Sequence, residues 1–240
     1  TNIFNYIESN FEIHWNLGAK DGGFLAMKYL KESTIEKVKI EKSSLKFYDK
    51  RIFPFLFGWC IAFLVFTGTQ VIAAFFIEDR LGVIGQNEII KATSIALLSM
   101  ALTTTLMQAV VLQIFNISFQ TLLRICFVIF GTILLSITLV QDLWHLYLAF
   151  SGIGIAFSMM TPGLNAGATL SVETHEQGEV AGLLAAAPVL GMIFGPPLGA
   201  FLYNLDTTYP FYYGGIVVLT LGVYFQFIKF PKDIHSKLDV

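Results

Sequence analysis

Apolar stretches and polar connections alternate through most of the chain. A helix needs about 20 apolar residues to cross a bilayer, and six stretches reach or approach that length. They are Ile52–Ile77, Lys91–Ile114, Ile125–Val140, Leu143–Leu170, Val180–Tyr203 and Tyr209–Ile228. The sequence has no alternating pattern typical of barrel strands, and open sheet edges are not stable in lipid. The pattern therefore predicts an all-α integral membrane protein with six transmembrane helices.

The composition supports a membrane protein. Hydrophobic residues make up 55% of the chain and charged residues only 13%, which is outside the range of ordinary soluble domains. The expected partner is the lipid bilayer. Cys60 and Cys126 both fall inside apolar stretches and have no neighbour at metal-ligand spacing. Neither a metal site nor a cofactor is therefore expected.

Basic residues are concentrated ahead of the first span. Nine of the fifteen Lys and Arg residues lie between Lys20 and Arg51. Because positive residues collect on the cytoplasmic side of a membrane, this asymmetry sets topology and does not indicate a nucleic-acid partner. Both ends of the six-span block are expected to face the cytoplasm, in the cell (plasma or inner) membrane. The expected parts are an amino-terminal segment with a basic cytoplasmic linker at 1–51, the transmembrane bundle at 52–229 and a cytoplasmic tail at 230–240.

Polar residues form one-sided stripes on the first, second and fourth spans, because residues three or four positions apart share a helix face. A polar stripe in lipid is costly unless it lines a cavity or packs on a neighbouring helix. The third and sixth spans are apolar nearly all round, so we predict that they are outer, lipid-facing helices.

Six residues of these stripes are candidates for a substrate cavity. They are Gln70, Gln108, Asn165, Thr161, Ser158 and Thr67. The three amides carry donors and acceptors that lipid cannot satisfy, so they either line a cavity or form hydrogen bonds between helices. Hydroxyl and small residues more often mark helix packing. Trp59 and Phe63 are interpreted as packing or lipid-facing residues rather than as substrate contacts.

The fifth span carries a longer pattern of small residues. It consists of Gly182, eight residues, Gly191, three residues, Gly195-Pro196, two residues and Gly199-Ala200. Such spacing lets two membrane helices approach closely, and Pro196 removes a backbone donor and bends a helix. The pattern resembles the antiporter motif of the major facilitator superfamily, in its drug:proton antiporter branch. The resemblance implies a helix-packing and gating role for Gly182, Gly191, Gly195, Pro196 and Gly199.

The resemblance also indicates which part of such a transporter this is. The connection between the second and third spans reads NISFQTLLR and lacks the Gly-Asp-Arg-rich signature of the family's amino-terminal half. Ahead of the linker, FLAMKYLKES resembles the end of a sixth helix. The six spans would then be helices seven to twelve, the carboxy-terminal half. The implied partner is a missing amino-terminal six-helix half, on the same polypeptide or on a partner chain.

The predicted function is secondary active transport of a small molecule, an amphiphilic compound being the expected type, by alternating access as an ion- or proton-coupled antiporter. No Asp, Glu, Lys or Arg lies deep in any span, so a coupling carboxylate would belong to the missing half. Two alternatives remain open. The chain is a non-transporting fragment or subunit that needs a partner half, or, remotely, a six-span membrane enzyme. An enzyme is not expected, because no deep His or carboxylate could serve as its base.

Overall fold

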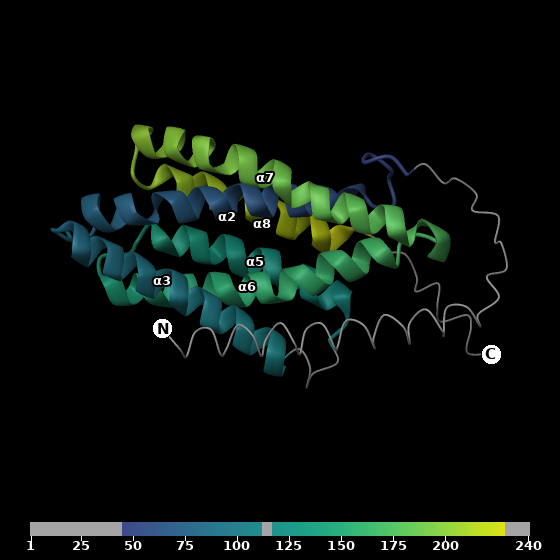
Figure 1. The fold of residues 1–240 in the computed structure, drawn as a ribbon, viewed down its shortest axis with the longest axis horizontal. Coiled ribbons are helices and arrows are strands. Elements are labelled where there is room, and N and C mark those ends of the chain that lie inside the picture. The colour runs from purple at the N-terminus through teal and green to yellow at the C-terminus, as the bar shows by residue number, and fades with distance from the viewer. Residues whose placement is uncertain (1–44, 112–116, 229–240) are drawn as a thin grey trace, which may run out of the picture. The chain divides into compact units, whose positions relative to one another are not determined.

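The computed structural model describes residues 45–111 and 117–228 of the 240-residue chain. The resemblance to a sixth helix at residues 24–33, most of the basic linker and the predicted tail lie outside these residues. The described part forms α2 (Phe53–Asp79), α3 (Gln86–Leu106) with a π-helical turn η1 (Met107–Val111), α5 (Phe119–Ile137), α6 (Leu143–Thr169), a 3₁₀ turn η2 (Thr174–Glu176), α7 (Gln177–Leu205) and α8 (Tyr209–Phe227). Six helices are long and apolar enough to cross a membrane, which confirms the predicted all-α fold (Figure 1).

Local sequence signals set several helix ends. The Asp142 side chain accepts a hydrogen bond from the His145 backbone N–H at 2.9 Å and caps α6, which begins where the sequence predicted. By contrast, α5 begins at Phe119 rather than Ile125, because Ser118 caps it and the helix continues through Arg124. Helix ends that reach the headgroup layer tolerate such a charge. The start of α5 was therefore predicted too far along the chain, because the prediction counted only uncharged residues.

Four pairs of helices make the most extensive contacts: α2 with α7, α5 with α6, α5 with α8, and α3 with α6 (Figure 1). Three of these pairs, α2 with α7, α3 with α6 and α5 with α8, remain the same set when the first three long helices are exchanged in order with the last three. That is the pattern expected of two inverted three-helix repeats. The contact of α5 with α6 departs from it, because its counterpart, α2 with α8, is much smaller.

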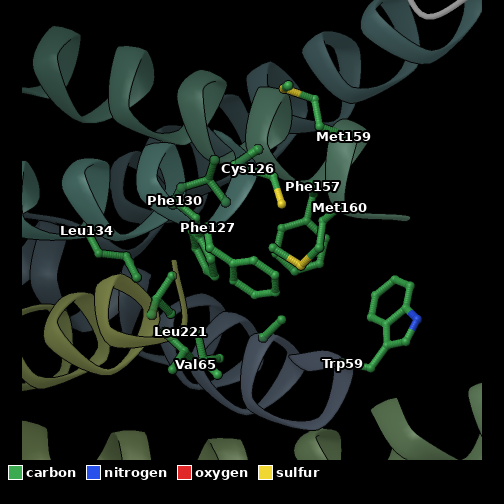
Figure 2. Packing of buried hydrophobic residues seen from close by; sticks show 14 of the residues in the cluster. Trp59, Val65, Cys126, Phe127, Phe130, Leu134, Phe157, Met159, Met160 and Leu221 are labelled. Atoms are coloured by element: carbon green, nitrogen blue, oxygen red, sulfur yellow. The ribbon is translucent and has the colours of Figure 1, made fainter. Parts of the chain in front are cut away.

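The core lies among α2, α5, α6 and α8. Phe127 of α5 stacks on Phe225 of α8 with ring centroids 5.0 Å apart, and Phe130 meets Phe157 of α6 edge-on at 5.5 Å. Figure 2 shows Phe127, Phe130 and Phe157 close to one another, with Trp59 further away. The buried aromatic rings therefore fix the positions of the helices that carry the candidate site.

Exposure differs between helices in a way the sequence did not predict. In the most apolar stretch of each span, 44% of residues are buried in α5 and α8, but only 17% in the α3 span and 22% in the α7 span. α5 and α8 do keep exposed apolar residues, such as Ile125 and Val217. Within this bundle, however, the least covered helices are α3 and α7 rather than α5 and α8.

Candidate substrate surface and helix-packing motif

An interhelical hydrogen bond joins two residues of the predicted stripes. The indole N–H of Trp59 on α2 donates to the Asn165 side-chain oxygen on α6 at 3.2 Å. Trp59 is 6% exposed, whereas Asn165 is exposed. An amide keeps two N–H donors besides its accepting oxygen, so Asn165 can still offer hydrogen bonds to another molecule.

Aromatic rings extend from Trp59 along α2 and onto α6. We call the four rings Trp59, Phe63, Phe66 and Phe157 the α2–α6 aromatic surface. Phe63 lies 5.2 Å from Trp59 and 5.7 Å from Phe157, and Phe66 lies 4.1 Å from Phe157, between ring centroids. Trp59 and Phe157 are buried, whereas Phe63 and Phe66 are half-buried and form the accessible part of this surface. The burial of Trp59 agrees with the packing role predicted for it. Its hydrogen bond to Asn165 was not predicted, although an indole N–H in an apolar stretch needs a partner.

The hydroxyl candidates donate to backbone carbonyls. Ser158 is fully buried, and its hydroxyl donates to the Ile155 carbonyl at 2.6 Å. The structure therefore places Ser158 in the core and away from any cavity. Thr161 is half-buried and donates to the Phe157 carbonyl at 3.1 Å. Thr67 donates to the Phe63 carbonyl at 2.7 Å, and its hydroxyl also lies 3.4 Å from the Gly191 carbonyl of α7.

The three amide candidates do not form one cluster. Gln70 is half-buried on α2, about 16 Å further along the helix axis than Trp59 at 1.5 Å per residue. Gln108 is exposed in η1. Of the three amides, Asn165 is the one that directly contacts the α2–α6 aromatic surface.

The glycine motif of α7 is a contact surface for α2. A Cβ added at Gly191 would meet the Cys60 carbonyl oxygen, and one added at Gly195 would meet the Thr67 hydroxyl. A Cβ at Gly199 would come within 2.8 Å of Gly68 Cα. These helices can approach this closely only because the positions lack side chains.

Two features of the motif differ from the sequence prediction. A Cβ at Gly182 would meet nothing within 4 Å in the described structure, so the close contact begins at Gly191. The partner glycine on α2, Gly68, was not identified from the sequence. Helix α7 continues unbroken through Pro188, Pro196 and Pro197.

α2 and α7 are joined at both ends as well. At one end, Arg51 donates to both Glu176 carboxylate oxygens, at 2.8 and 2.9 Å. At the other end, the Tyr203 hydroxyl donates to Asp79 at 2.7 Å. These pairs are separated by 125 and 124 residues, and the mid-helix Thr67 and Gly191 pair by 124. The two helices therefore run parallel in one register over their whole length.

The Arg51 end of this pair is a small charged network. Hydrogen bonds to Asp49 and then to Glu176 raise the pKa of Arg51 further above its ordinary value. Hydrogen bonds from the Arg51 side chain and backbone hold the pKa of Asp49 below its ordinary value. Glu176 is only 7% exposed, and both of its carboxylate oxygens accept hydrogen bonds from Arg51 just ahead of helix α2.

The α3 and α6 pair uses the polar stripes for packing. Thr104 donates to the Gly154 carbonyl at 3.1 Å, and Ser99 lies 3.2 Å from the Tyr147 carbonyl. A Cβ at Gly154 would meet the Met100 carbonyl oxygen. The small and hydroxyl residues at this interface therefore serve helix contact, as such residues often do in membranes.

Comparison with known proteins agrees with this architecture. The sequence model of the Major Facilitator Superfamily matches residues 55–238. This chain belongs to the major facilitator superfamily. Two curated relatives in Bacillus subtilis (strain 168) align with it: Multidrug resistance protein 2, 29% identical over 100 residues, and Multidrug resistance protein 1, 26% identical over 102 residues. Each alignment covers 42% of this chain but about a quarter of the relative, 25% and 26% respectively.

Membership of the superfamily matches the repeat pattern in the bundle. Each six-helix half of such transporters contains two inverted three-helix repeats, which is the symmetry of the three helix pairs described above. Among the described residues, no group of three or more His, Cys, Asp or Glu side chains could hold a metal ion.

Proposed function

We propose that this chain forms the carboxy-terminal six helices of a secondary transporter that moves a small amphiphilic molecule by alternating access. The observation that carries the proposal is the exposed Asn165 amide beside the α2–α6 aromatic surface. Aromatic rings accept the apolar body of a ligand and can attract a cation, while the amide orients its polar end. Both relatives are named for multidrug resistance, which supports an efflux role.

The proposal includes an opposing six-helix bundle over α3 and the aromatic surface. Exposed apolar residues do not distinguish a covering bundle from lipid, because lipid would cover them equally well. Exposed polar groups indicate such a cover, namely Ser94 and Gln108 on the α3 span and Asn165 on α6. These groups are costly in lipid and are better placed facing a polar cavity or another bundle.

Coupling to an ion or proton is assigned to that opposing bundle. In the described spans, charged side chains lie near helix ends, for example Asp79 at the end of α2 and Lys91 near the start of α3. A proton-coupling carboxylate within the membrane would be expected to face a cavity. The antiport mode therefore depends on residues that this bundle does not supply.

α2 and α7 are expected to move together during alternating access. Their parallel register is held by contacts at both ends and by glycines between them, so separating them would break all of these contacts at once. In this role the motif keeps α7 attached to α2 while the two bundles rock against each other. The gating role is thus carried by the pair rather than by α7 alone.

The test is transport by the full-length protein in liposomes. Asn165→Ala and Trp59→Phe should each raise the KM for an aromatic amphiphile several-fold, because they remove the amide or its hydrogen-bond donor. Gln70→Ala and Gln108→Ala test the remaining amides. Gln226→Ala is the matched control, since Gln226 is an exposed amide of α8 that donates to the Arg124 carbonyl. Unchanged kinetics in all four site variants would overturn the proposed site.

A further inference from the structure

A cavity of about 90 Å³ lies where α2, α7 and α8 meet, away from the aromatic surface. Its lining includes Val65 and Thr69 of α2, Gly199 of α7, and Tyr213, Gly214 and Val217 of α8. It adjoins the contact between Gly68 and Gly199 but serves no part of the proposed transport site. The cavity therefore needs its own explanation.

Glycines create this cavity and prevent the chain from filling it. A Cβ at Gly214 would come within 2.8 Å of Val65 Cγ1, and one at Gly199 would come equally close to Gly68 Cα. Side chains at these positions would force the helices apart instead of occupying the space. A side chain at either glycine would therefore not fill the cavity, which leaves room for a group that the described residues do not supply.

The lining selects an apolar occupant. Apart from Tyr213, Thr69 is the one polar side chain in the lining. Its hydroxyl already donates to the Val65 carbonyl at 2.8 Å. A water molecule needs two to four polar partners to be stable in such a space. A hydrocarbon group needs none and gains contacts with every apolar wall.

The mouth of the cavity is formed by exposed residues of two membrane-spanning helices. Leu198, Tyr213 and Val217 line it and are 41%, 47% and 42% exposed. They lie on spans α7 and α8, and Gly68 lies close to the midpoint of α2. The medium at this depth is the hydrocarbon core of the bilayer.

We propose that this cavity binds the end of an acyl chain from a bilayer lipid. Its volume corresponds to roughly three methylene groups, each close in size to a water molecule at ~30 Å³. The acyl end would fill the space beside the close contact of α2 and α7 and join α8 to that pair. This site is independent of the proposed transport function, because it faces lipid rather than a substrate route.

The test uses the full-length protein in bilayers that contain phosphatidylcholine with a photoreactive diazirine on one acyl chain. After illumination, adducts are mapped by mass spectrometry. At one fixed fraction of photoreactive lipid, we expect a higher adduct yield on Leu198 than on Val223. Both are aliphatic, but Val223 of α8 lies outside the cavity and is the more exposed of the two, at 55% against 41%. A yield on Leu198 no higher than that on Val223 would overturn the proposal.

A matched pair of variants gives a second readout. Val217→Phe places a ring in the mouth and should lower adducts on Leu198 and Tyr213 at least three-fold. Val223→Phe makes the same change on α8 outside the cavity and should leave them unchanged. Equal adduct yields in the two variants would overturn the proposal. The comparison of Leu198 with Val223 in the unaltered protein stands even if Val217→Phe fails to fold.

Discussion

The contact between Glu176 and Arg51, near the start of α2, shows how a charged residue of a connection can stabilise the fold. Glu176 accepts two hydrogen bonds from Arg51 and a third, at 3.1 Å, from the Glu173 backbone N–H, which closes a capping box around η2. A carboxylate that is this buried needs such partners. The sequence marks Glu176 only as one of several acids in a polar connection, so its burial could not be predicted.

Glu176→Gln should lower the free energy of unfolding by about 1–2 kcal/mol. Charge-assisted hydrogen bonds contribute about 1.5–3 kcal/mol, and the value is reduced here because the Arg51 side chain is 45% exposed. Unfolding in detergent, followed by circular dichroism, measures the change. Glu88→Gln is the control, because its pair with Lys91 is exposed and 3.9 Å long. An equal loss of unfolding free energy in both variants would contradict the stabilising role of the pair of Glu176 and Arg51.

The contribution of Asp49 should depend on pH. Arg51 lowers the pKa of Asp49 in the folded protein, so the unfolded chain binds this proton more readily than the folded one. The stabilisation is then present above the ordinary aspartate pKa of about 3.9 and is lost as the pH falls through the lowered value. The stability difference between the wild type and Asp49→Asn should therefore shrink in acid. A difference that stays constant with pH would exclude this linkage.

At the scale of helices, the α2 and α7 pair depends on missing side chains. Gly195→Ala should destabilise the protein by about 1–3 kcal/mol, because the added methyl would meet the Leu64 carbonyl and Thr67 hydroxyl oxygens. Gly182→Ala on the same helix should be neutral or stabilising by up to about 1 kcal/mol, since it has open space and gains helix propensity. Thermal unfolding compares the two. A larger loss for Gly182→Ala would contradict the packing described.

The helices themselves could be predicted from the sequence, but their contacts could be predicted only in part. Runs of apolar residues located all six spans, because the bilayer sets their length. The spacing of Gly191, Gly195 and Gly199 predicted a close contact. Spacing along one helix does not show where the neighbouring helix diverges, so Gly182 was wrongly included in the contact. Nor does it show which residue of the neighbouring helix lies opposite, so Gly68 was not predicted. Asn165 was identified as an unsatisfied amide, but its partner Trp59 follows from the packing of α2 on α6.

For the molecule as a whole, the structure connects the charge pattern to specific loops. Arg51 ends the basic segment and binds Glu176 in the connection between α6 and α7. That connection therefore lies on the same side of the membrane as Arg51, the last basic residue ahead of α2. Since basic residues favour the cytoplasmic side, the connection between α5 and α6 is expected on the outside.

Cysteine labelling tests this orientation in a background without Cys60 and Cys126. Gln141, between α5 and α6, and Thr174, between α6 and α7, are both exposed. A membrane-impermeant maleimide applied to intact cells should label Gln141→Cys at once, but Thr174→Cys only after the membrane is permeabilised. We expect Thr174 to lie inside, because positive residues such as those of the linker favour the cytoplasmic side. Labelling in the opposite order would show that the bundle has the inverse orientation, with the pair of Arg51 and Glu176 on the outside.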